Sequence, residues 1–262
     1  MNKITVIGGG NMGEAIIGGI RKNYSVTVCE KDKSRQDHLR QTYKVNTGEI
    51  KTSVPGSDVI ILAVKPQDIE EVLKEISPGS GPKILVISIA AGITTAFIEK
   101  HLPEKTRVIR TMPNMPAMIG QGITAVARGK HAKQSDQDLA SAIFDHLGKT
   151  VAVGEDQLDM ITAVSGSGPA YVFLLIETMI KAARSMGLNE ELAKQLVRST
   201  FLGSVNLLEM KKEDAASLRS KVTSKGGTTE AAIEVFMKSN IEAIFAQALE
   251  AAKKRAAELS RS

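Results

Sequence analysis

Short apolar runs alternate with polar segments along the chain as far as Gly154. The runs are rich in valine and isoleucine, and their near-continuous apolar character is typical of parallel strands that are covered on both faces. The segments between them have the period of helices, so the pattern predicts βαβ units. The expected strands are Lys3–Ile7, Ser25–Cys29, Asp58–Val64, Lys83–Ile89, Arg107–Arg110 and Gly122–Ala127. The expected helices are Met12–Lys22, Asp32–Thr42, Pro66–Ile76 and Ser135–Leu147.

The pattern changes after Gly154, where strand-like runs disappear and alanine, leucine, glutamate, lysine and methionine dominate. Within this half Tyr171–Ala183 is apolar around most of its circumference, and such a helix must be buried on nearly every side. About 108 residues can hardly bury that helix and its neighbours alone. We therefore expect a doubly wound parallel α/β sheet in residues 1–154 and an all-α domain in residues 155–262. The helical domain is expected to form a homodimer, with assembly into a larger homo-oligomer left open.

Composition and charge exclude several classes of protein and site. The net charge of +5 favours solubility, and the absence of tryptophan with only 3% aromatic residues leaves few stacking platforms for nucleic acid. Cys29 is the only cysteine, so an intrachain disulfide or a thiolate zinc site cannot form. The apolar run Ile4–Ile7 is too short for a signal peptide, and we expect no other segment to approach the ~20 apolar residues of a membrane span. We expect a soluble cytoplasmic protein without nucleic-acid or membrane partners.

A glycine-rich loop joins the first predicted strand to the first predicted helix. Gly8 to Gly13 match the pattern G-x-G-x-x-G. In that pattern the first glycine permits a tight turn, the second admits a pyrophosphate, and the third lets the helix pack on the strand. The context predicts dinucleotide binding in a Rossmann-type domain. The residues expected to contact the cofactor here are Gly8, Gly10, Asn11, Met12 and Gly13.

The pattern also requires an acidic residue about 20 positions further on, where it binds the adenosine ribose. Glu30 occupies that position. A carboxylate there would repel the 2′-phosphate of NADPH by ~4 kcal/mol at a distance of about 4 Å and an effective dielectric constant near 20. Lys31 and Arg35 could instead clamp that phosphate while Glu30 turns to solvent, or all three could form a solvated charge cluster. We expect both NADH and NADPH to serve and leave the preference open.

Five further segments stand out after the glycine-rich loop. They are Ala63–Pro66 (AVKP), Ser88–Thr94 (SIAAGIT), Arg110–Ala117 (RTMPNMPA), Ser165–Tyr171 (SGSGPAY) and Val222–Thr229 (VTSKGGTT). With these segments in the family's order, the chain resembles pyrroline-5-carboxylate reductases over nearly its whole length. The resemblance implies reduction of L-1-pyrroline-5-carboxylate to L-proline, the last step of proline biosynthesis, by hydride transfer from NADH or NADPH to the imine carbon.

The first three of these segments follow predicted strands. Because a doubly wound sheet binds its ligand at the carboxyl ends of its strands, we expect them to contact the cofactor. Asn114 could meet the nicotinamide carboxamide or its ribose, or it could satisfy local backbone groups. Lys65 could meet a phosphate or a substrate carboxylate, or it could simply be solvated. The residues assigned to the cofactor here are Ala63, Val64, Lys65, Pro66, Ala90, Met112, Pro113 and Asn114.

The last segment precedes a predicted helix and forms a candidate anion site. Unpaired N–H groups at a helix start, glycines and hydroxyl groups could hold a carboxylate, although Thr228 could equally be an ordinary N-cap. The resemblance implies that this loop binds the substrate carboxylate and that Thr229 reaches the ring nitrogen as the catalytic residue. The residues assigned to the substrate are Ser224, Gly226, Gly227, Thr228 and Thr229.

The chain departs from the family pattern at several positions. Lys225 replaces the usual proline of the substrate loop, and Glu30 replaces an asparagine or serine. Asp214–Ala216 replaces a His-Pro-Gly segment, and Arg219 with Ser220 replaces Lys-Asp. A related imine or β-hydroxyacid reductase and a non-catalytic nucleotide-sensing relative are therefore kept as alternatives. Hydride transfer to an imine requires no metal, and the four scattered histidines predict no metal site. They are His38, His101, His131 and His146.

Overall fold

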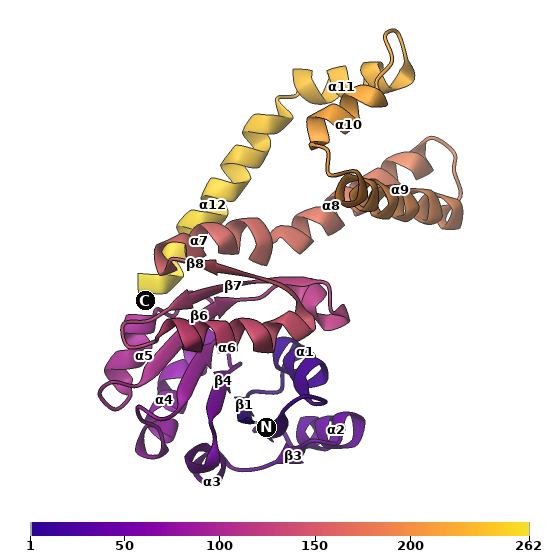
Figure 1. The fold of residues 1–262 in the computed structure, drawn as a ribbon. Helices are drawn as coiled ribbons and strands as arrows, with labels where there is room; N and C mark the ends of the chain where they lie inside the picture. Colours follow the sequence, from indigo (N-terminus) through magenta and orange to yellow (C-terminus); the bar gives the residue numbers. More distant parts are fainter. Residues whose placement is uncertain (1, 262) are drawn as a thin grey trace. The chain divides into compact units, whose positions relative to one another are not determined.

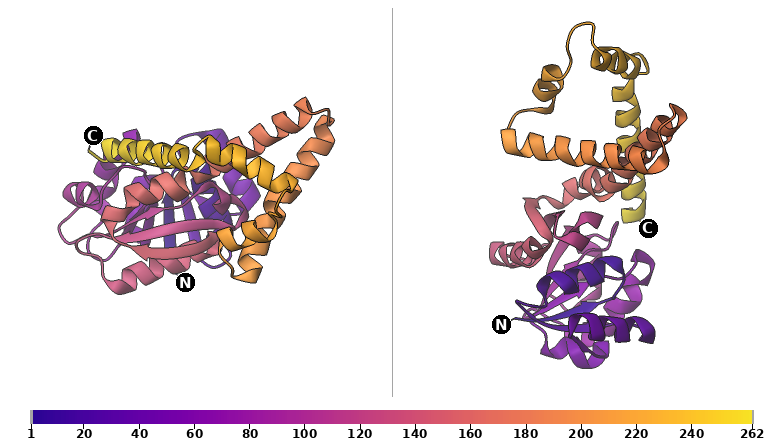
Figure 2. Two further views of the ribbon diagram at one scale, coloured as in Figure 1. Left: turned by 90° about the horizontal axis from the view of Figure 1, so that it is seen from above. Right: turned by 90° about the vertical axis from the view of Figure 1, so that its right-hand side faces the viewer.

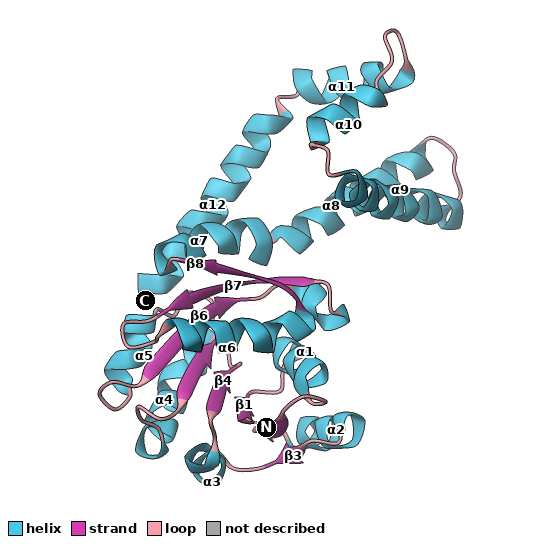
Figure 3. Cartoon of the chain, viewed as in Figure 1, coloured by secondary structure: helices cyan, strands magenta, loops and turns pink. Residues whose placement is uncertain are grey.

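The chain folds into two compact units in a computed structural model that describes residues 2–261. The first unit comprises residues up to Ser167 together with those from Ala251 onward, and the second is Gly168–Glu250. The first contains the sheet, and the second is helical (Figure 1, Figure 3). The expected boundary lay after Gly154, whereas the observed first unit continues to Ser167. The segment after Gly154 still packs on the sheet.

Eight strands form a single sheet in the order β3-β2-β1-β4-β5-β6-β7-β8. The strands from β3 to β6 are parallel, which gives the doubly wound order that places a ligand beside β1. β7 runs antiparallel to β6, because the connecting residues 113–121 are too few for the crossover of a dozen or more that a parallel pair needs. The strands are β1 (Lys3–Ile7), β2 (Ser25–Cys29), β3 (Asn46–Thr47), β4 (Val59–Leu62), β5 (Leu85–Ser88), β6 (Arg107–Met112), β7 (Gly122–Arg128) and β8 (Gly148–Val153).

The six expected strands are confirmed, with small differences at their ends, whereas β3 and β8 were not expected. β3 is only two residues long. β8 is an edge strand of the described sheet whose residues are all half-buried or exposed, so it lacks the continuous apolar run used to recognise the others.

Helices cover both faces of the sheet (Figure 2). Adjacent residues Ile60 and Ile61 of β4 are both fully buried and enter opposite cores, as the alternation of side chains along a strand requires. One face packs against α1 (Asn11–Ile20), α2 (Lys33–Tyr43) and α6 (Gln134–Phe144). The other packs against α3 (Ile50–Ser53), α4 (Ile69–Ile76) and α5 (Thr95–His101).

Two elements beyond the expected domain boundary belong to the first unit. α7 (Leu158–Ile161) buries Leu158 against Ala125 and Ala127 of β7. The end of α12 (Ile241–Arg261) lies against the loop after β5, where a Cβ added at Gly92 would stand 2.9 Å from Leu259. The first unit therefore includes residues from both ends of the sequence.

The second unit confirms the prediction of an all-helical region, but it has almost no core in the single chain. Ala193 and Val197 are its only buried residues. Large apolar side chains are exposed on α8, α9 and α11; Leu174 is 60% exposed, Leu202 65% and Phe236 52%. The unit contains α8 (Gly168–Ser185), α9 (Glu190–Lys211), α10 (Ala215–Lys221), α11 (Thr228–Lys238) and the first part of α12.

The segment Glu155–Ser185 is long and apolar enough to cross a membrane, judged by length and composition alone. The expectation that no segment approaches such a length was therefore wrong. The core helix of a soluble protein can have the same length and composition, but α8 has no buried residue in the isolated chain.

Candidate functional site

A cavity of about 720 Å³ lies at the carboxyl ends of β1, β2 and β4. These strands flank the point where the strand order reverses, which is where doubly wound sheets bind their ligands. The volume is in the range of small-molecule and cofactor sites. The expected cofactor residues that line it are Gly8, Gly10, Glu30, Lys31, Ala63, Val64 and Lys65.

The three glycines that match the pattern, Gly8, Gly10 and Gly13, have separate structural roles. Gly8 has a φ of +100°, and a Cβ there would lie 2.5 Å from the Ala63 carbonyl oxygen. A Cβ at Gly13 would lie 2.2 Å from the Gly8 carbonyl oxygen, so only glycine allows α1 to approach the loop so closely. A Cβ at Gly10 would meet nothing within 4 Å, which leaves open space beside the backbone. The loop therefore fits a pyrophosphate.

Helix α1 begins at Asn11, directly after this open glycine. The first N–H groups of a helix have no partner within the helix and carry partial positive charge. They therefore suit a phosphate at this position. The side chain of Met12 packs against the hydrophobic core, so its expected contribution to the cofactor site is limited to its backbone.

The carboxylate of Glu30 is held at the end of β2 by two backbone donors. Its Oε2 accepts from the Gly9 N–H at 2.6 Å, and its Oε1 accepts from the Asp32 N–H at 3.0 Å. The residue is half-buried and lines the cavity. The alternative in which Glu30 turns to solvent is therefore not the arrangement observed.

The two basic residues near Glu30, Lys31 and Arg35, make different contacts. Arg35 donates from Nε to the Gly9 carbonyl at 2.5 Å and pairs with Glu14 at 2.5 Å. Arg35 is not among the residues that line the cavity, whereas Lys31 is. The Lys31 ammonium lies 3.3 Å from Glu71 on the surface, with both side chains more than 70% exposed. Such an exposed pair holds its partners weakly.

The loops after β5 and β6 are fixed by local hydrogen bonds. Ala90 is buried, and its N–H donates to Ser88 Oγ at 3.2 Å. Asn114 is buried, and its Oδ1 accepts from the Ile123 N–H at 2.9 Å. The amide oxygen of Asn114 thus satisfies local backbone, as the alternative interpretation held. A contact between its amide nitrogen and the nicotinamide stays a prediction, as do the expected contacts of Pro66, Met112 and Pro113.

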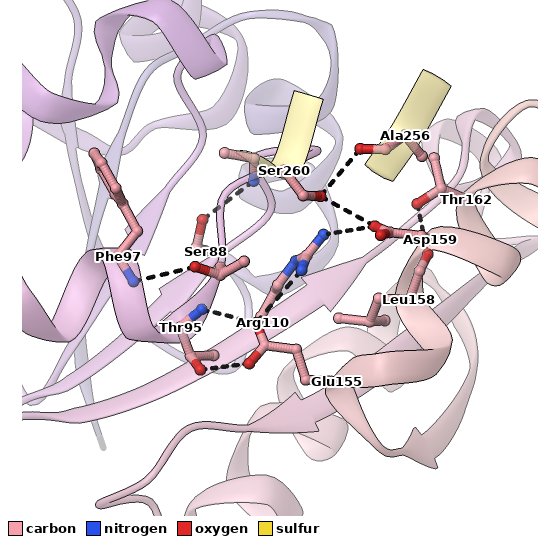
Figure 4. Close-up of polar contacts among 12 residues, drawn as sticks. Ser88, Thr95, Phe97, Arg110, Glu155, Leu158, Asp159, Thr162, Ala256 and Ser260 are labelled. Atoms are coloured by element: carbon pink, nitrogen blue, oxygen red, sulfur yellow. Dashed lines mark hydrogen bonds and ion pairs between the residues drawn. The ribbon is translucent and has the colours of Figure 1, made fainter. Parts of the chain in front are cut away.

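A buried charge cluster at Arg110 joins several segments of the first unit (Figure 4). Arg110 lies in β6, is 4% exposed and pairs with Glu155 at 3.4 Å and Asp159 at 3.5 Å. Glu155 also accepts from the N–H and hydroxyl of Thr95, at 2.7 and 2.6 Å. Ser260, near the end of α12, donates to Asp159 at 3.1 Å. The cluster therefore ties the start of α5 to β6, to the turn after β8 and to the end of the chain.

This cluster was missed by the sequence analysis, although a signal was present. Arg110 follows Val108 and Ile109 within an apolar strand. An arginine in such a position must have carboxylate partners, because an unpaired buried charge is very costly. The partners themselves lie far away in sequence and could not be named.

The candidate substrate loop belongs to the second unit. α11 begins at Thr228 and its N-cap is Gly227, so the interpretation of Thr228 as the N-cap is wrong. A Cβ at Gly227 would lie 2.9 Å from the Ser224 carbonyl oxygen, and this close approach to the backbone favours glycine. The Gly226 N–H donates to the Glu230 carboxylate at 2.6 Å. The loop thus already binds one carboxylate, which belongs to the chain itself.

Two family models match the chain. The model described as pyrroline-5-carboxylate reductase dimerisation matches residues 155–259. The model described as NADP oxidoreductase, coenzyme F420-dependent, matches residues 3–92.

Curated relatives are similar over nearly their whole length. The pyrroline-5-carboxylate reductase of Synechocystis sp. is 38% identical, and the match covers 99% of this chain and 98% of the relative. That of Mycobacterium tuberculosis is 36% identical, with 99% and 97% covered.

Solved structures agree with these relatives. A pyrroline-5-carboxylate reductase from Coxiella burnetii is 38% identical with a TM-score of 0.93, covering 100% of this chain and 99% of its own. A pyrroline carboxylate reductase from Plasmodium falciparum with NADP bound is 28% identical with a TM-score of 0.89, covering 99% and 98%.

The Arg110 cluster can be tested through stability. Arg110→Met should lower the free energy of unfolding by about 3 kcal/mol, because it leaves two carboxylates without their cation. The loss should lie at the low end of the range for buried pairs, because Glu155 and Asp159 are 27% and 28% exposed. Urea unfolding measures the change. Arg255→Met, the same substitution in an exposed pair with Glu258, should cost less than ~1 kcal/mol, and equal losses would contradict the role of the cluster.

Proposed function

The chain belongs to the pyrroline-5-carboxylate reductase family, and on that premise we propose that it reduces L-1-pyrroline-5-carboxylate to L-proline, the last step of proline biosynthesis. Both halves of the chain support this activity, because two pyrroline-5-carboxylate reductases match 99% of the chain at 36% and 38% identity. The chain is an NAD(P)H-dependent oxidoreductase whose first unit has the Rossmann-type sheet.

The cofactor site fits a nicotinamide dinucleotide on the geometry of its own residues. The open backbone at Gly10 and the start of α1 suit the pyrophosphate, and Glu30 lies where the adenosine ribose is expected. The nicotinamide, when bound, supplies the hydride. The protein's residues bind and orient the reactants, so their contribution is one of positioning.

We assign the substrate carboxylate to the loop from Ser224 to Thr229. The bond between the Gly226 N–H and Glu230 supports this assignment, because it identifies a backbone donor that already faces a carboxylate. The substrate carboxylate would replace that of Glu230 on this donor. Thr229 is the second residue of α11, and we assign its hydroxyl to the ring nitrogen of the substrate, where it holds or donates the proton that the imine gains on reduction.

A direct assay tests the proposed function. The purified protein should oxidise NADH or NADPH only when pyrroline-5-carboxylate is present, with proline formed in equal amount. A β-hydroxyacid reductase would instead oxidise NADH or NADPH with an oxo acid as the hydride acceptor, and a nucleotide-sensing relative would bind cofactor without turnover. Either result would overturn the proposal.

We propose that the second unit forms a homodimer. Its helices expose large apolar side chains in the single chain, and the family model that covers this region is named for dimerisation. A second copy that covers these surfaces would give the unit the core it lacks. Assembly beyond the dimer, a cytoplasmic location and the absence of nucleic-acid and membrane partners stay predictions.

The role of Thr229 predicts a selective loss of turnover. Thr229→Val keeps the shape and removes the hydroxyl, so kcat should fall by ~10²–10⁴-fold while cofactor affinity is nearly unchanged. Ser224→Ala should mainly raise KM for the substrate, because a carboxylate contact acts in ground and transition states alike. Steady-state kinetics measure both. Thr200→Val on α9 is the matched control, and near-normal kcat in folded Thr229→Val would contradict the catalytic role.

The bond from Gly226 to Glu230 predicts competition with the substrate. Glu230→Ala should lower KM for pyrroline-5-carboxylate roughly tenfold, because one backbone donor is released, and a hydrogen bond to a charged group contributes about 1.5 kcal/mol or more. Glu234→Ala on the same helix, whose carboxylate pairs with exposed Lys238, should leave KM unchanged. A higher KM in Glu230→Ala would show that Glu230 holds the loop in its binding conformation.

The proposed dimer predicts that a charge on α8 prevents assembly. Leu175→Asp should reduce the mass in light scattering to that of a monomer and lower Tm, because the buried charge would have no partner. Lys181→Asp places the same charge on the same helix at a side chain that is 70% exposed, and it should leave the dimer intact. A stable monomer of the unchanged protein at micromolar concentration would contradict the proposal.

A further inference from the structure

The cavity beside β1 and β2 has an acidic lining. Four carboxylate side chains and two lysine side chains line it. A phosphate on the adenosine ribose would add further negative charge to this environment, and like charges repel strongly where water is partly excluded. The acidic residues are Glu30, Glu49, Asp68 and Glu75, and the basic ones are Lys31 and Lys65.

Glu30 and Arg35 contact the same residue of the glycine loop. Glu30 accepts from the Gly9 N–H, while Arg35 donates to the Gly9 carbonyl. Arg35 therefore lies within a short side-chain movement of the expected ribose position. An arginine is well suited to a phosphate because its planar donors bind two oxygens at once.

Glu14 pairs with the Arg35 guanidinium. Its Oε2 accepts from Arg35, and its Oε1 accepts from His38 Nε2 at 2.9 Å and from the Tyr43 hydroxyl at 3.0 Å. The Arg35 and Glu14 side chains are 31% and 21% exposed, so their pair is shielded from solvent more than a surface pair. Partial burial alone would raise the pKa of the Glu14 carboxyl, but the bonds from His38 and Tyr43 and the charge of Arg35 outweigh it and lower that pKa. Glu14 is thus ionised when the enzyme works.

We propose that Glu14 is a positioning residue for cofactor choice: it holds Arg35 on the glycine loop, leaves Glu30 facing the ribose, and thereby makes the enzyme favour NADH over NADPH. The inference rests on the proposed function only in requiring that the cavity bind a nicotinamide dinucleotide. It assigns a role in specificity to a residue of α1 that lies outside the cavity lining.

Equilibrium binding tests the proposal without turnover. The Kd values of NADH and NADPH for the full-length protein are measured by titration calorimetry, with 5′-AMP and adenosine 2′,5′-bisphosphate as fragments that isolate the ribose end. The unchanged protein should bind NADH more tightly than NADPH, and 5′-AMP more tightly than adenosine 2′,5′-bisphosphate. Glu14→Ala should lower the ratio of the NADPH Kd to the NADH Kd roughly tenfold, because Arg35 becomes free to pair with the 2′-phosphate.

A double variant separates release of Arg35 from simple loss of a negative charge. In Glu14→Ala with Arg35→Ala the gain in NADPH binding should disappear, whereas it would persist if it came from charge alone. Asp37→Ala removes a carboxylate that pairs with Arg40 on α2, and it should leave the ratio unchanged. If Glu14→Ala does not fold, Glu14→Gln replaces it in the experiment. Glu14→Gln keeps the volume of the side chain and should shift the ratio in the same direction.

Three results would overturn the inference. They are tighter or equal binding of NADPH by the unchanged protein, an unchanged ratio in both Glu14 variants, and a gain that survives in the double variant. Normal turnover of pyrroline-5-carboxylate accompanied by any of these would leave the proposed function intact. If the protein binds neither dinucleotide, the inference about Glu14 and the proposed function are both wrong.

Discussion

The close approach of α1 to the glycine loop is the contact on which the first unit depends. A Cβ at Gly13 would lie 2.2 Å from the Gly8 carbonyl oxygen, and one at Gly8 would lie 2.5 Å from the Ala63 carbonyl oxygen. Any larger side chain would push the helix away from β1 or the loop away from β4. The same loop offers the Gly9 N–H to Glu30 and the Gly9 carbonyl to Arg35. The phosphate and ribose ends of the site are therefore set by one short stretch of backbone.

Arg110 provides a second constraint, of a different kind. The net stability that its cluster contributes is smaller than the attraction between its charges, because burying charges costs much of what their pairing returns. The cluster joins the start of α5, the turn after β8 and the last turns of α12. The loops after β5 and β6, which are expected to contact the cofactor, leave the sheet beside these fixed points.

The sequence predicts well whatever depends on local pattern. The glycine spacing and the apolar runs locate β1, β2 and the cavity, because the backbone geometry of the loop depends on residues next to each other. It predicts poorly whatever depends on contacts between distant residues. Glu30 could be placed by its spacing from the loop, but the pairing of Arg35 with Glu14 requires the packing of α1 against α2. The edge strand β8 and the cap at Gly227 were missed for related reasons, since edge strands lack a continuous apolar run and a glycine can replace a threonine as N-cap.

The proposed substrate loop lies in a unit that has almost no core of its own, and this would link catalysis to assembly. A loop that must orient a hydroxyl group within a fraction of an ångström needs rigid support from the helices around it. In the single chain, Ala193 and Val197 are the only buried residues of that unit, so its helices are held together weakly. The proposed dimer would supply the missing apolar contacts and so fix α11, the helix that follows the loop. Lys225 adds to this requirement, because without the usual proline the loop loses more conformational freedom when it binds. Substrate binding in this protein should therefore depend on assembly more strongly than in relatives whose loop carries the proline.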